Sequence, residues 1–148
     1  MTLKEKISQK LKEAMLAHDE FAKITLSGLK SAILYEEVAK GKRDEGLDDT
    51  ETETVIAREV KKRDDAIELY VAAGDKERAE KEMAEREILT GFLPEPLSDD
   101  ELREIIERVI TTDGFTIKDM GRVIGDVKKE VGSRGDGAKI AAIVKELL

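Results

Sequence analysis

The chain has 148 residues, of which 40% are hydrophobic and 41% are charged, and its net charge at neutral pH is −8. The hydrophobic share is sufficient for a folded core, which excludes a wholly disordered chain. The absence of cysteine excludes disulfides, thiol catalysis and cysteine-based zinc sites, and a single histidine, His18, is too few for a histidine-rich metal site.

Apolar residues at helical spacing predict two amphipathic helices in the first 40 residues. The buried side of the first helix is predicted to hold Leu3, Ile7, Leu11 and Met15. Asp19 can cap the second helix. The buried side of that helix is predicted to hold Phe21, Ile24, Leu29 and Ile33.

A glycine-containing loop around residues 41–49 separates these helices from a third. Thr50 and Glu53 fit a capping box at its start. The buried side of this helix is predicted to hold Ile56, Val60, Ile67 and Val71. It should end near Gly74, and Asp75 then begins a fourth, highly charged helix.

Both prolines lie in the segment Leu93-Pro94-Glu95-Pro96-Leu97, which marks the clearest boundary because proline excludes its predecessor from helical geometry. Ser98 and Glu101 form a capping box for the next helix, which Gly114 ends. Thr116 is predicted to begin a helix that reaches Val131. After a loop at 132–135, Asp136 can cap the last helix.

No segment shows the alternating pattern of a strand, so the sequence predicts an all-α fold with four helices before the prolines and three after them. The proline boundary divides the chain into an N-terminal helical domain, residues 1–93, and a C-terminal three-helix domain, residues 94–148. The absence of a signal peptide and of an apolar stretch long enough to span a bilayer predicts a cytoplasmic protein without a membrane partner.

Positive charge is concentrated in the predicted helix 116–131. At 100° per residue, Lys118, Arg122 and Lys129 lie within about 40° of one another, opposite the apolar side. From residue 114 to the C-terminus there are seven basic and five acidic residues, a net charge of +2 in a chain of net charge −8. The pattern is typical of a small nucleic-acid contact on an otherwise acidic protein.

Gly121 and Gly125 lie on one flank of the same helix, and each interior glycine costs about 1 kcal/mol relative to alanine. Two explanations are open for these close-approach glycines. A neighbouring helix of the chain can pack tightly against them, or the bare backbone can receive a phosphate backbone or a partner's helix.

The loop at residues 132–137 offers a further candidate anion contact, because it precedes a helix N-terminus and has Arg134 and Lys139 nearby. Asp136 can occupy the free backbone amides itself, as a cap. The loop is no P-loop, because Lys139 comes one position late and no strand precedes it. The sequence shows no catalytic, metal or cofactor motif.

The sequence resembles the YqeY-like family, which is related to the tail domain of the GatB subunit of glutamine-dependent tRNA amidotransferase. The resemblance runs nearly end to end and is carried by residues 58–64, by residues 89–94 and by Lys-Asp-Met-Gly-Arg-Val-Ile-Gly at 118–125. It implies a C-terminal domain similar to the GatB tail, which helps to hold tRNA, with Lys118 and Arg122 as RNA contacts.

The resemblance and the basic residues together predict a non-catalytic tRNA-binding accessory module, with Lys118, Arg122, Lys129, Arg134 and Lys139 at the RNA and no DNA partner or cofactor. Two alternatives stay open. One is a protein-interaction module. The other is a carbon–nitrogen ligase of the tRNA amidotransferase type, with glutamine as amide donor.

Overall fold

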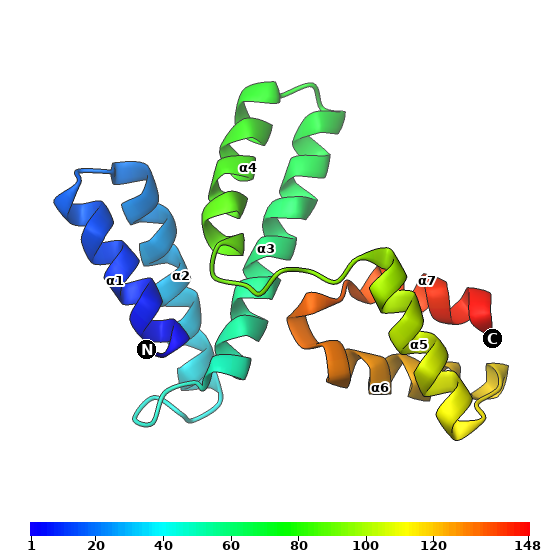
Figure 1. Ribbon diagram of the computed structural model, residues 1–148. Coiled ribbons are helices and arrows are strands. Elements are labelled where there is room, and N and C mark those ends of the chain that lie inside the picture. The colour runs from blue at the N-terminus through cyan, green and yellow to red at the C-terminus, as the bar shows by residue number, and fades with distance from the viewer. The chain divides into compact units, whose positions relative to one another are not determined.

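The computed structural model describes residues 1–148 and contains seven α-helices, two short 3₁₀-helices and no strand, so the predicted all-α fold is confirmed (Figure 1). The helices are α1 (Leu3–Leu16), α2 (Glu20–Ala39), α3 (Asp49–Ala72), α4 (Lys76–Thr90), α5 (Asp99–Asp113), α6 (Met120–Val131) and α7 (Gly137–Leu147). Contacts group the chain into two compact units, Met1–Leu93 and Pro94–Leu148, and each is described by itself.

Three of the predicted N-caps, Asp19, Ser98 and Asp136, are present, and Asp75 caps the helix that it was predicted to begin. The side chains of Asp19, Asp75, Ser98 and Asp136 each accept a hydrogen bond from a backbone N–H in the first turn of α2, α4, α5 and α7. Each satisfies a donor that has no partner within the helix. Gly114 ends α5 in the left-handed conformation, as predicted.

The predicted cap of α3 is wrong by two residues. Asp48 rather than Thr50 is the N-cap, and it forms the capping box with Glu51 rather than with Glu53. Both pairs fit the local pattern, but Leu47 N–H donates to the buried Glu37 carboxylate at 2.9 Å and fixes the chain immediately before Asp48. A long-range contact therefore decides where α3 begins.

The segment predicted as one helix from Thr116 to Val131 begins differently. Residues Ile117–Asp119 form a 3₁₀ turn, and α6 starts at Met120. The Asp119 carboxylate accepts a hydrogen bond from Thr116 N–H at 2.9 Å and closes a three-residue turn. Lys118 therefore lies in the turn before α6, so the 100° spacing that places it beside Arg122 does not hold for it.

The unit Met1–Leu93 is built from two helical hairpins, α1 with α2 and α3 with α4 (Figure 1). Its core consists of residues from the loop before α3 and from all four helices: Leu3, Ile7, Leu29, Ile33, Leu47, Val55, Ile56, Val60 and Leu89. The buried residues of α3 all lie between Thr52 and Val60, which leaves the second half of that helix packed mainly against α4.

Several residues predicted to be buried are exposed. Met15 is exposed and Ala14 is buried in its place, because steps of four residues drift by 40° per step from one side of a helix. Phe21 and Ile24 lie on a side of α2 that the unit does not cover. Val71 lies beyond the buried half of α3.

The unit Pro94–Leu148 is a three-helix arrangement of α5, α6 and α7 around a separate core. Its fully buried side chains are Leu102, Ile106, Val123, Val127, Ile140 and Val144. The segment before α5 is held to the loop before α7, because Leu97 N–H donates to the Arg134 carbonyl at 2.9 Å. The outward side of α6 is thereby fixed on a packed three-helix support.

Candidate nucleic-acid interface

The candidate interface is the outward side of α6 together with the turn that precedes it. Val123, Val127 and Val131 are the buried residues of α6 and recur every four residues along one side. Their burial fixes the rotation of the helix about its axis. Arg122 and Lys129 are directed away from this core, and both are exposed.

Three of the predicted RNA contacts are exposed cations without an anionic partner. Lys118, Arg122 and Lys129 take part in no ion pair. Arg122 and Lys129 are seven residues apart, which places them about 10.5 Å apart along the helix axis at 1.5 Å per residue. Charges that no acid of the protein neutralises are available to an anionic ligand.

Arg122 is held in place by an aromatic ring. Its guanidinium carbon lies 5.3 Å from the centroid of the Phe115 ring, within the range of a cation–π interaction. Such a contact restricts the side chain without using its hydrogen-bond donors, so these donors stay free for a phosphate. No sequence signal identified Phe115, because the ring contact spans the junction between α5 and α6.

The two close-approach glycines lie on open surface. A β-carbon added at Gly121 or Gly125 would meet no atom within 4 Å, and both residues are exposed. The explanation that a neighbouring helix of the chain packs tightly against them is therefore wrong. The flank of α6 next to Arg122 instead presents bare backbone.

The closest approach to a glycine in this unit is at Gly135, in the loop before α7. A β-carbon there would lie 2.6 Å from Val131 Cγ2 and 3.3 Å from Ile140 Cδ1. The loop at 132–137 is thus constrained by core packing. The Asp136 carboxylate accepts a hydrogen bond from the Ala138 N–H at 3.1 Å, as expected of an N-cap.

The other two predicted contacts, Arg134 and Lys139, have partners within their unit. Arg134 Nε donates to the carbonyl of Glu95 at 3.0 Å, and Lys139 Nζ lies 3.1 Å from the Asp99 carboxylate. Both side chains of the Lys139–Asp99 pair are more than half exposed, so the pair is weak and exchangeable. Arg134 and Lys139 therefore differ from Lys118, Arg122 and Lys129, which have no such partner.

Acidic residues border the basic side of α6. Glu130 forms an ion pair with Arg108 of α5, which neutralises the Glu130 charge. Asp126 is exposed and has no ion pair. Asp126 is four residues from Arg122 and three from Lys129, so it lies beside both cations on the helix surface, and Lys128 adds a further exposed cation without an ion pair.

A family model described as Yqey-like protein matches residues 4–148 of the chain. The chain belongs to the YqeY-like family. The match covers both compact units, so both are part of what defines a YqeY-like protein. Comparison with curated protein sequences finds no match.

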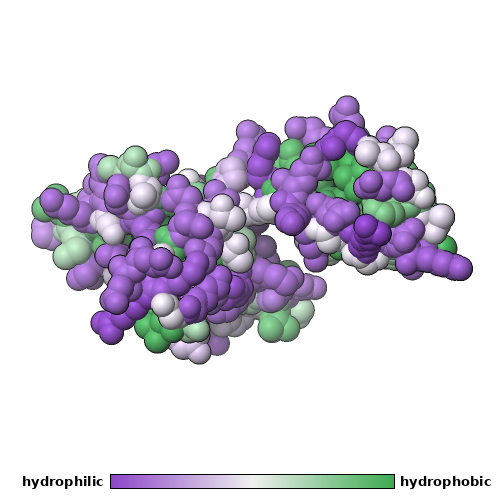
Figure 2. All heavy atoms as spheres, turned by 90° about the horizontal axis from the view of Figure 1, so that it is seen from below, coloured by the Kyte–Doolittle hydropathy of each residue, from purple (hydrophilic) through white to green (hydrophobic).

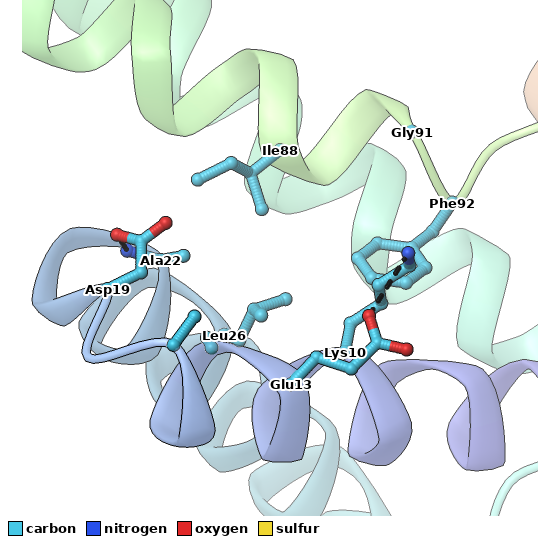
Figure 3. A pocket seen from close by; sticks show the side chains of 10 residues that line it. Lys10, Glu13, Asp19, Ala22, Leu26, Ile88, Gly91 and Phe92 are labelled. Atoms are coloured by element: carbon cyan, nitrogen blue, oxygen red, sulfur yellow. Dashed lines mark hydrogen bonds and ion pairs between the residues drawn. The ribbon is translucent and has the colours of Figure 1, made fainter.

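An apolar hollow of this YqeY-like protein lies elsewhere, among α1, α2 and the end of α4 (Figure 3). Its volume is about 410 Å³, and Ile88 and Phe92 point toward it from the α4 side. Lys10 and Glu13 lie at its edge, with a nitrogen–oxygen separation of 3.3 Å. The hollow lies within the unit Met1–Leu93.

The YqeY-like chain contains no group of three or more acidic or histidine side chains placed to hold a metal ion. Its most perturbed carboxyl groups serve the helix framework. Hydrogen bonds from Lys42 Nζ, from the Asp48 N–H and from Lys40 Nζ lower the pKa of Glu51 to about 2, against a smaller opposing effect of burial. None of the helices combines the length and apolar composition needed to cross a bilayer.

Proposed function

We propose that this YqeY-like protein is a non-catalytic accessory module that binds tRNA through the outward side of α6. The observation that supports the proposal is the set of three exposed cations, Lys118, Arg122 and Lys129, without acidic partners. Gly121 and Gly125 lie between them in sequence and allow a ligand to approach the backbone. Phosphate groups are the natural ligands of such an arrangement.

The charge distribution favours a local contact over general attraction to nucleic acid. The net charge of −8 repels a polyanion, so binding depends on the few cations of α6 and of the turn before it, and on the shape of the RNA. A small number of phosphate contacts predicts weak binding with a modest salt dependence. Lys139 adds to the contact only when it leaves Asp99, and a smaller contribution is expected from it.

The decisive experiment measures the tRNA affinity of the full chain across a series of salt concentrations. The double variant Lys118→Ala with Arg122→Ala removes two phosphate contacts, so the slope of log affinity against log salt should fall by about two units. The matched control is Lys12→Ala with Lys81→Ala, which removes the same charge from exposed positions without ion pairs in the other unit. The control should leave the slope unchanged.

An affinity that the Lys118 and Arg122 variant leaves unchanged would contradict the proposal. An equal loss with the control variant would do so as well, because it would reduce the effect to net charge. Glutamine-dependent amidation of a mischarged tRNA by the purified chain alone would overturn the non-catalytic part and favour a carbon–nitrogen ligase.

A protein-interaction module is the second candidate, and the open glycine flank of α6 favours it. Ile117 is 67% exposed in the turn just before Gly121, and together they offer an apolar contact beside bare backbone. A partner recovered by pull-down after nuclease treatment, and lost with Gly121→Leu, would support this candidate over tRNA. Loss of the partner on nuclease treatment would exclude it.

A further inference from the structure

Helix α2 is apolar on two opposite sides. One side holds the buried residues Leu26, Leu29 and Ile33. The other side is a stripe of residues at alternating spacings of three and four, which we call the α2 stripe. It consists of Phe21, Ile24, Gly28, Ser31, Tyr35 and Val38.

The α2 stripe is exposed and uncharged. Tyr35 is 78% exposed, Ile24 66% and Val38 58%, and a β-carbon at Gly28 would meet nothing within 4 Å. Charged residues make up 41% of the chain, yet none lies on the stripe over 18 consecutive residues. Figure 2 shows that hydrophilic side chains otherwise cover most of the visible surface, with hydrophobic residues in separate patches.

We propose that the α2 stripe is a homodimer interface in which two copies of α2 pair antiparallel. Its spacing is that of the a and d positions of a heptad, which keeps one side of a helix facing a partner helix. The stripe has small residues, Gly28 and Ser31, at its centre and large residues at both ends. An antiparallel copy places Ile24 opposite Tyr35 and brings the small centres together, where the backbones can approach closely.

The area of the stripe suits a weak dimer. An exposed large apolar side chain offers about 150–250 Å², so the large residues of the stripe together with Leu34 leave on the order of 500 Å² uncovered per copy. Two copies would bury on the order of 1,000 Å², close to the lower limit of specific interfaces. The dimer should therefore form in the micromolar range and dissociate on dilution.

Charge at the two ends of the stripe favours the antiparallel orientation. Glu20 begins α2 beside the stripe, and Arg43, which is exposed and has no ion pair, lies just beyond its other end. Antiparallel pairing brings Glu20 of one copy toward Arg43 of the other and aligns the helix dipoles favourably. A parallel pair would instead place the two Glu20 carboxylates at the same end.

The self-association is measured by sedimentation equilibrium of the full chain from 1 to about 300 µM, a range that spans the micromolar affinities expected of so small an interface. Ile24→Glu places a charge in the stripe and should raise the dimer dissociation constant by at least about tenfold. The matched control is Leu69→Glu on α3, because Leu69 is similarly exposed, at 71%, and the charge change is the same. The control should dimerise like the wild type.

Cysteine cross-linking tests the orientation, since the chain has no cysteine of its own. The variants Ile24→Cys and Tyr35→Cys, carrying different affinity tags, are mixed and oxidised. An antiparallel pair brings residue 24 of one copy near residue 35 of the other, so the mixed disulfide should form in preference to either homodimer.

Three results would overturn the proposal. They are a wild-type chain that stays monomeric throughout the concentration range, equal loss of dimer with Leu69→Glu, and preferential formation of the Ile24→Cys or Tyr35→Cys homodimer, which indicates a parallel pair. Binding of the monomer to neutral lipid vesicles through Ile24 would likewise replace a second copy with a membrane surface as the occupant of the stripe.

Discussion

The surroundings of a single carboxyl group in the α3–α4 hairpin, that of Glu82, change its pKa. Burial and the neighbouring Glu85 carboxyl raise the pKa of Glu82, and the charge of Arg63 only partly offsets this. The folded-state pKa therefore lies above the unfolded value of about 4.3. The stability linked to this proton is present at low pH and is lost as the pH rises through the folded pKa.

We therefore expect Glu82→Gln to raise the free energy of unfolding at pH 7, because glutamine removes the repulsion with Glu85 and needs no proton. The gain should shrink toward zero near pH 4, where Glu82 is protonated in the wild type. Urea denaturation at both pH values measures the difference. Glu87→Gln, at an exposed position on α4 without an ion pair, is the control and should change stability little at either pH. A gain that persists undiminished at pH 4 would contradict this account.

The ion pair between Lys4 and Glu37 leaves little space for a side chain at position 46. The buried Glu37 carboxylate accepts from Lys4 Nζ at 2.5 Å and from Leu47 N–H at 2.9 Å. Burial alone would raise the pKa of Glu37, but these two hydrogen bonds lower it below its ordinary value. A β-carbon at Gly46 would lie 3.0 Å from Lys4 Nζ and 3.2 Å from Glu37 Oε2.

Gly46→Ala should destabilise the protein more than Gly41→Ala. Both glycines have positive φ, +77° and +66°, so both substitutions carry a backbone cost of about 1–2 kcal/mol. Only position 46 adds crowding of the ion pair, which should cost about 1 kcal/mol more. Thermal or urea unfolding of the two variants gives the difference directly. Equal losses would show that Lys4 and Glu37 move aside freely.

At the scale of the helix, glycine position decides whether alanine stabilises or destabilises the unit Pro94–Leu148. Gly125→Ala should stabilise it by about 1 kcal/mol, because the new methyl group meets nothing and the helix gains propensity. Gly135→Ala should destabilise it, because its β-carbon would lie 2.6 Å from Val131. The stability change of each variant is measured by urea unfolding, with the amide exchange of α6 as the readout for this unit. A destabilising Gly125→Ala would show that the flank is covered.

Local chemistry predicted most of the helix ends. Asp19, Ser98 and Asp136 cap the helices that the sequence assigned to them, because an N-cap needs only a side-chain oxygen and the amides two or three residues later. Thr50 failed because Asp48 offers the same chemistry two residues earlier. The choice between them depends on the distant Glu37 carboxylate, which no local pattern contains.

The candidate site, like the helix ends, was predictable where it depends on local sequence and not where it depends on distant contacts. The exposure of Arg122 and Lys129 follows from the apolar period of α6 alone. The engagement of Arg134 and Lys139 does not, because their partners Glu95 and Asp99 lie 39 and 40 residues away in sequence. The spacing of apolar residues and the positions of charged residues thus predict which surface is basic. Tertiary contacts decide which of its basic residues are left without a partner.

At the scale of the whole molecule, two hydrophobic cores raise the question of whether the chain folds as one cooperative unit or two. The core residues of Met1–Leu93 and of Pro94–Leu148 form separate clusters. The segment between them contains both prolines, which cannot continue a helix from one unit into the other. We propose that the units are independently folding domains, residues 1–93 and 94–148.

Matched core truncations test this independence. Ile56→Ala and Ile106→Ala each remove a fully buried isoleucine, one from each cluster, and each should cost about 2–5 kcal/mol. If the units unfold separately, Ile56→Ala lowers the protection of amides in α1–α4 only, and Ile106→Ala lowers that of α5–α7 only, in native-state hydrogen exchange of the full chain. A loss of protection spread over all seven helices in either variant would mean that the two cores unfold together, because a single cooperative transition distributes the cost of any cavity over the whole molecule.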